Sequence, residues 1–122
     1  MVRVHSLIVL VTLVALSPAR GAEEDFGCAG PDTSTFFDAC VNLKKAQRLE
    51  LAISRKLEEL SKSGPSGVAE SELASSQAEW ARYRDRACNA QQLLMGGTNS
   101  VSYARCSSFL AQQRLEYLQA NY

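Results

Sequence analysis

The sequence is poor in the residues that most catalytic and metal sites use. Its single histidine, His5, lies near the N-terminus in a segment that the leader predicted below would remove, and its four cysteines include no Cys-x-x-Cys pair. Catalysis of the Ser-His-Asp or Cys-His type needs a histidine. Zinc sites and thioredoxin-like redox sites need closely spaced cysteine or histidine side chains. The sequence therefore predicts a protein that is not an enzyme, with no catalytic residues, no metal and no cofactor.

An excess of charge and a long apolar run are also missing. Acidic and basic residues number 13 each, and both signs are mixed along every segment. Nucleic-acid binding needs a basic face, so we expect no nucleic-acid partner. The longest apolar run, residues 7–16, is shorter than the roughly 20 residues of a membrane span. We therefore expect no stable membrane insertion, with a retained N-terminal anchor as the alternative.

The first 22 residues are typical of a secretory leader. Arg3 and His5 form a basic start, residues 7–16 are apolar apart from Thr12, and Ser17-Pro18-Ala19 supplies small residues for cleavage. We expect a signal peptide over residues 1–22, cleaved after residue 19 to 22, and one mature domain over residues 23–122. The protein is then periplasmic or secreted. No lipid-attachment site is expected, because the first cysteine follows acidic and aromatic residues.

Apolar residues and helix breakers predict three helices over residues 33–62, 67–95 and 100–120. The first stripe steps by three or four residues, as a helix requires, through Phe36, Cys40, Leu43, Ala46, Leu49, Ile53, Leu57 and Leu60. Ser63-Gly64-Pro65-Ser66-Gly67 and Gly96-Gly97-Thr98-Asn99 separate the helices. The third helix is expected to turn inward Tyr103, Cys106, Phe109, Leu110, Tyr117 and Leu118. Short connections favour an all-α, small antiparallel three-helix bundle.

The last two predicted helices place particular side chains opposite one another. Trp80, Arg84 and Cys88 are spaced four residues apart, so they share one helix face. Folding the chain back about residue 97 brings Cys88 level with Cys106 and Trp80 level with Arg114. Folding the first helix back about Pro65 brings Leu51 level with Trp80. The tryptophan is therefore expected to be a central plug that stacks on Arg114.

Four cysteines in a small exported chain indicate two disulfides. The hairpin geometry favours Cys88–Cys106, which leaves Cys28–Cys40 to fix the irregular lead-in to the first helix. The alternative pairing is Cys40–Cys88 with Cys28–Cys106, because Cys40 falls within one turn of the level of Cys88.

The arginines of the second and third helices have two interpretations each. Arg84 and Arg114 share a stripe with apolar residues, so their stems pack at the rim of the bundle, or they line a groove for an acidic partner. Arg82 and Arg86 lie on the opposite side of the second helix. They form either a solvated face or a contact patch for a partner that carries carboxylates.

The motif Gln77-x-x-Trp80-x-x-Tyr83-Arg84-Asp85-x-x-Cys88 and the cysteine spacing resemble the bacterial lysozyme inhibitor LprI-like N-terminal domain family. The likeness runs from Cys28 to Leu118, and its signature core is Trp80, Tyr83, Arg84 and Arg114. Members of this family are small, exported, helical and disulfide-bonded. The resemblance implies the same build here and an inhibitor of c-type lysozyme.

Two functional hypotheses follow from the sequence and the resemblance. In the first, the protein binds c-type lysozyme, whose cleft carries two carboxylates. The inserted element is then the Gly96–Ser100 turn, which contains Asn99, or the Arg82 and Arg86 face. In the second, the protein is a structural or interaction module of the cell envelope with another protein partner. The sequence sets no oligomeric state.

Overall fold

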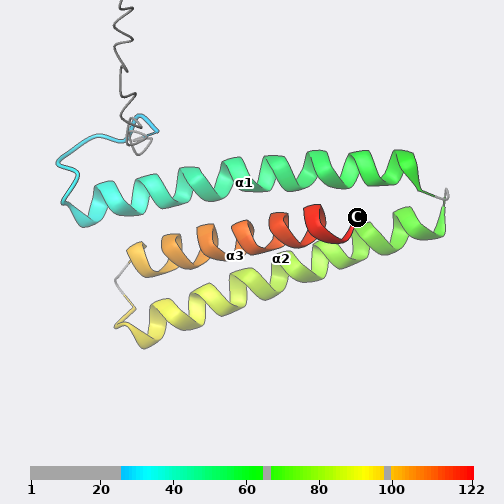
Figure 1. The fold of residues 1–122 in the computed structure, drawn as a ribbon. Helices are drawn as coiled ribbons and strands as arrows, with labels where there is room; N and C mark the ends of the chain where they lie inside the picture. The colour runs from blue at the N-terminus through cyan, green and yellow to red at the C-terminus, as the bar shows by residue number, and fades with distance from the viewer. Residues whose placement is uncertain (1–25, 65–66, 98–99) are drawn as a thin grey trace, which may run out of the picture.

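A computed structural model of the chain describes residues 26–64, 67–97 and 100–122. It contains three helices, α1 (Thr35–Ser63), α2 (Val68–Leu94) and α3 (Ser100–Asn121), each antiparallel to the one before it (Figure 1). The predicted all-α bundle is confirmed, and the helix ends differ from the predicted ones by at most two residues. The predicted signal peptide, residues 1–22, lies outside the described residues, as does Asn99.

Local signals set the ends of α1. The hydroxyl of Ser34 accepts a hydrogen bond from the amide of Phe37 at 3.1 Å, which caps one of the free N–H groups of the first turn. Asp38 lies in the same turn, where a negative charge is favourable. At the other end, the amide of Gly64 donates to the carbonyl of Leu60 at 3.1 Å. The next residue in the sequence is Pro65, which has no amide hydrogen with which to continue the helix.

The apolar core lies mainly between α1 and α3. Its buried side chains form two clusters, Ala39 with Val101 and Ala104, and Ile53 with Ala111 and Leu118. Because many of these side chains are small, the two helix backbones approach closely along much of their length. Figure 1 shows α3 lying between the other two helices, and α1 and α2 share few contacts.

Helix α2 contributes little to this core. Among its residues of known burial, Cys88 is the buried one. Trp80 is half-buried and packs against the Ile53 cluster. The expected central plug is therefore a side chain at the edge of the core. Leu51, which the same folding places level with Trp80, is 60% exposed because α3, rather than α2, covers the inner face of α1.

Several aromatic and aliphatic residues expected inside lie outside. On α1, Phe36 is 82% exposed and Leu43 is also exposed, and on α3 both Phe109 and Tyr117 are exposed. The predicted helical period is confirmed, but the covered stripe is narrower than expected. Since α1 packs mainly against one neighbour, only a narrow stripe centred on Ala39, Ala46 and Ile53 is buried.

The two disulfides join Cys28 to Cys40 and Cys88 to Cys106. This pairing confirms the one that hairpin geometry favoured and excludes the crossed alternative. The first disulfide fixes the lead-in, residues 26–34, to the first turns of α1. The second ties α2 to α3 and is the more deeply buried of the two, since Cys88 and Cys106 are both buried while Cys28 and Cys40 are half-buried.

Candidate protein-binding surface

The signature motif occupies the second half of α2, and its inner stripe faces the bundle as predicted. Trp80 packs on the core, Arg84 lies one turn further along, and Cys88 is bonded to Cys106 of α3. Tyr83 belongs to the same motif but points away from the core, with 60% of its surface exposed. The motif therefore has an inner face that holds α2 in place and an outer face that is open.

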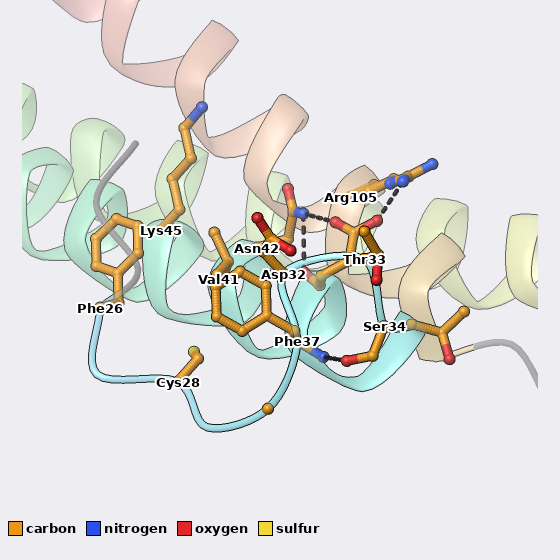
Figure 2. Close-up of a pocket in the computed structure, with 13 residues that line it drawn as sticks. Phe26, Cys28, Asp32, Thr33, Ser34, Phe37, Val41, Asn42, Lys45 and Arg105 are labelled. Atoms are coloured by element: carbon orange, nitrogen blue, oxygen red, sulfur yellow. Dashed lines mark hydrogen bonds and ion pairs between the residues drawn. The ribbon is translucent and has the colours of Figure 1, made fainter. Parts of the chain in front are cut away.

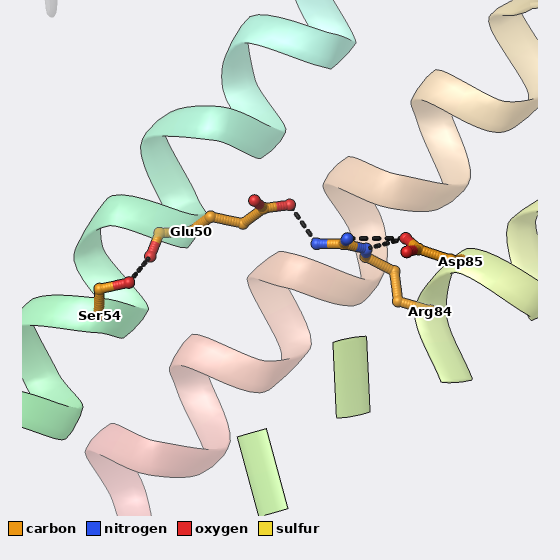
Figure 3. A network of polar contacts seen from close by, with 4 residues as sticks. All are labelled: Glu50, Ser54, Arg84 and Asp85. Atoms are coloured by element: carbon orange, nitrogen blue, oxygen red, sulfur yellow. Dashed lines mark hydrogen bonds and ion pairs between the residues drawn. The ribbon is translucent and has the colours of Figure 1, made fainter. Parts of the chain in front are cut away.

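Arg84 is the centre of the polar contacts on the inner face (Figure 3). Its Nε and Nη2 donate to Oδ1 of Asp85 at 2.9 and 2.7 Å, and Nη1 forms an ion pair with Glu50 of α1. The guanidinium carbon lies 5.3 Å from the ring centre of Trp80. The side chain is only 14% exposed. Arg84 thus links α2 to α1, which supports its structural interpretation.

Arg114 makes a second polar link, from α3 to α2. It donates from Nε to Gln77 at 3.2 Å and from Nη2 to Ser76 at 3.1 Å. Its guanidinium lies 5.9 Å from the ring centre of Tyr117. The expected stacking of Arg114 on Trp80 is wrong. Arg84 is one helical turn beyond the tryptophan on the same helix, and its guanidinium lies over that ring instead.

The outer face of α2 carries the two arginines predicted as partner contacts. Arg82 and Arg86 are exposed and one turn apart, and they line a shallow depression together with Glu79, Tyr83 and Ala87. Within the described part of the chain, neither guanidinium has an ion-pair partner. These side chains are therefore available to a partner, which distinguishes them from Arg84 and Arg114.

A second, larger depression lies between the lead-in and α1 (Figure 2). The ring of Phe26 lies 4.4 Å below the guanidinium of Arg48, and the rim carries Asp38. That carboxylate accepts from Asn42 at 2.6 Å and forms an ion pair with Arg105 of α3. This ion pair could not be predicted from the sequence, because its partners are far apart in the chain and no motif joins them.

The polar network at this depression also crosses the helix interface. The hydroxyl of Ser108 on α3 donates to Oδ1 of Asn42 at 2.9 Å. The two polar residues, both at least half-buried, thus satisfy each other. Among the described residues, no group of three or more His, Cys, Asp or Glu side chains is placed to hold a metal ion. None of the described helices is long and apolar enough to cross a bilayer.

The fold and these surfaces define a small all-α domain, braced by two disulfides, whose open features suit binding to another protein. A family model described as lysozyme inhibitor LprI matches residues 28–118. The chain therefore belongs to the LprI lysozyme inhibitor family, as the cysteine spacing and the tryptophan motif predicted. Searches among curated proteins and among solved structures found no significant match.

Proposed function

We propose that this protein inhibits c-type lysozyme by binding it. The observation that carries the proposal is the family match over residues 28–118. Inhibition is proposed to be stoichiometric and to need no cofactor or metal, with the folded surface acting as the inhibitor. The protein would thereby protect the bacterial cell wall from the enzyme.

The outer face of α2 supports a binding role. Arg82, Tyr83 and Arg86 are exposed together, and arginine and tyrosine are enriched among the residues that dominate binding energy at interfaces. Lysozyme cleaves glycosidic bonds with two carboxyl groups, and a guanidinium matches a carboxylate in both charge and geometry. A face with two arginines that have no ion-pair partner among the described residues is suited to that target.

The proposed location is the periplasm or the exterior of the cell. Disulfides persist in oxidising compartments, and this domain has two of them. Residues 1–22 are proposed to act as a cleaved signal peptide and residues 23–122 to form the mature protein. Lysozyme attacks the wall from the same compartment.

The alternative is a structural or interaction module of the envelope that does not act on lysozyme. The exposed ring of Phe36 favours a protein contact on a helix other than α2. Stoichiometric binding of lysozyme separates the two functions.

The test is a titration of the oxidised mature protein, residues 23–122, against a c-type lysozyme that clears bacterial cell walls. We expect clearing to stop near an equimolar ratio, and reduction with alkylation to abolish the effect. An Arg82→Ala/Arg86→Ala variant should weaken inhibition by roughly tenfold or more, as loss of interface arginines does. Arg55→Ala, an exposed arginine on α1, is the matched control. Unchanged clearing, with no binding at micromolar concentrations, would reject the proposal in favour of the envelope module.

A further inference from the structure

The end of the α2–α3 hairpin is apolar, exposed and without charge. Leu93, Leu94 and Met95 follow one another in the chain and are 72%, 86% and 62% exposed. We call these three residues the hairpin tip. No charged residue occurs between Arg86 and Arg105. Three consecutive exposed apolar side chains at the end of a narrow element form a contiguous patch, and such patches mark interaction sites.

The hairpin tip is also braced. The amide of Met95 donates to Gln91 at 3.1 Å, and that of Gly97 donates to Gln92 at 2.9 Å. The side chain of Gln92 donates back to the carbonyl of Gly97 at 3.2 Å. Gly96 and Gly97 have φ angles of 97° and 75°, a backbone conformation that glycine adopts without steric strain. Bracing of this kind lowers the ordering cost of binding.

Below the tip, the Cys88–Cys106 disulfide joins the two helices of the hairpin. The stem therefore cannot splay apart when the tip meets a surface. The tip is a preformed, convex element on a covalently closed stem.

The hairpin tip continues the arginine face of α2. Arg82, Arg86, Asn89 and Leu93 are spaced i, i+4, i+7 and i+11, so they lie along one stripe of the helix, and all four are exposed. The stripe is basic along the stem and apolar at its end. A partner that covers the tip would therefore also meet the two arginines.

On these grounds we infer that the hairpin tip is the element that enters the substrate cleft of the lysozyme and blocks it. This inference rests on the proposed function. A convex apolar end fits a concave, mainly apolar site. In lysozyme, the general acid lies in a hydrophobic pocket close to an ionised carboxylate. The tip brings no carboxylate of its own to that site, while Arg82 and Arg86 approach the rim.

Two other partners, a second copy of the chain and a membrane, are less suited to cover the tip. A second copy of the chain that met it end to end would bury only three side chains on each partner. Stable interfaces bury roughly 1,200–2,000 Å² in total, which is more than such a contact provides. An anionic membrane favours basic residues beside an inserted apolar element, but a flat surface would contact the tip alone, because the nearest basic residues, Arg86 and Arg105, lie seven and ten residues back along the stem. A cleft, by contrast, contacts the flanks of both helices as well as the tip.

The experiment compares the wild-type mature protein with a Leu93→Ser/Leu94→Ser/Met95→Ser variant against c-type lysozyme. Because the three side chains are exposed, the variant should keep its helical circular dichroism and its Tm. We expect its inhibition to weaken by roughly 30-fold or more, the loss of one strong interface anchor. The matched control is Leu51→Ser, which removes a 60% exposed leucine from α1. The control should inhibit within about twofold of wild type.

A second measurement tests the cleft directly. A soluble N-acetylglucosamine oligosaccharide that occupies the cleft should displace the wild-type protein competitively. The inference would be overturned if the serine variant inhibited as strongly as the wild type, or if the oligosaccharide did not compete with the wild-type protein. Either result would leave the inhibitor function intact. Dimerisation, or sedimentation with phosphatidylglycerol vesicles, that depends on the tip without oligosaccharide competition would also overturn it. A wild-type protein that does not bind lysozyme would reject the proposed function itself.

Discussion

Helix α3 is attached to its two neighbours by different kinds of contact. On the α1 side, small and branched apolar side chains such as Ala104, Ala111 and Leu118 are buried against Ala39 and Ile53. On the α2 side, the Cys88–Cys106 disulfide and the hydrogen bonds of Arg114 replace most of that apolar burial. Helices α1 and α3 thus form the apolar scaffold, while α2 is held mainly by covalent and polar contacts and leaves its outer face free.

The difference between the two attachments of α3 has a physical reason. All three helices leave apolar or aromatic side chains in solvent, but α1 and α3 also bury an apolar stripe against each other, whereas α2 buries little and leaves Tyr83, Leu93 and Leu94 outside. Covalent and polar attachment compensates for the apolar area that the exposed residues do not bury. The attachment of α2 thus permits an outer face that is open to a partner.

The largest effect is expected in the scaffold. Ile53→Ala empties a site that is fully buried between α1 and α3. Since an isoleucine-to-alanine change in a core removes contacts and leaves a cavity, the free energy of unfolding should fall by about 2–5 kcal/mol. Urea denaturation monitored by circular dichroism measures this free energy. Leu51→Ala on the exposed side of the same helix should change it by less than about 0.5 kcal/mol. Equal losses in the two variants would contradict the assigned core.

The two disulfides should differ in their effect. Cys88→Ser/Cys106→Ser should lower the free energy of unfolding by about 3 kcal/mol, the value for closing a loop of this length, because it releases α2 from α3. Cys28→Ser/Cys40→Ser should have a smaller effect, since it releases a lead-in that can open without the helices. The Tm values of the two double variants show which disulfide contributes more to stability. A larger loss from the lead-in pair would show that residues 26–34 support the helices.

The polar link between α2 and α1 should contribute less to the free energy of unfolding than the Ile53 side chain or the Cys88–Cys106 disulfide. Arg84→Ala removes an ion pair with Glu50 and two hydrogen bonds to Asp85. Both carboxylates are about half exposed, which screens the charges, so the expected loss in unfolding free energy is about 1–2 kcal/mol. A double-mutant cycle with Glu50→Gln isolates the contact between helices. Additive effects of the two substitutions would mean that this ion pair does not join α2 to α1.

The smallest effect concerns one exposed pair on α1. The hydrogen bond from Lys62 at 2.6 Å, and the charge of that lysine, hold the pKa of Glu58 below the 4.5 of an unperturbed glutamate. A carboxyl group whose pKa is lower in the folded than in the unfolded state stabilises the folded protein at pH values above the unfolded-state pKa. This contribution is lost as the pH falls through the folded-state pKa. The Tm difference between wild type and Glu58→Gln should therefore be present at pH 7, absent at low pH, and reduced by salt. A difference that persists at low pH would exclude the ion pair as its source.

Much of the scaffold could be predicted from local patterns. Ser34 and Gly64 mark the ends of α1 because capping and helix termination depend on neighbouring residues only. The distance of each cysteine from the turn at residue 97 predicted Cys88–Cys106, because an antiparallel hairpin places equidistant residues together. The family followed from the tryptophan motif and the cysteine spacing.

The exposed side chains could not be predicted in this way. Phe36 and Leu43 continue the helical period of α1, and only the choice of α3 as the inner neighbour leaves them outside. In the same way, periodicity alone gave no reason to expect Leu93 and Leu94 in solvent. The sequence thus singled out Arg82, Arg86 and the Gly96–Ser100 turn as candidate contacts, whereas the exposure of Leu93, Leu94 and Met95 is a property of the folded arrangement.

The sequence by itself determined the three helices to within two residues at their ends and the family, and it favoured the cysteine pairs that the structure shows, because each of these depends on spacing along one chain. The tertiary structure decided which helix lies between the others, which arginine reaches Trp80, and which apolar residues remain in water. These depend on how much surface each neighbouring helix covers, which cannot be calculated from the sequence of one helix alone. Since binding uses what the packing leaves uncovered, the hairpin tip emerged only from the folded arrangement.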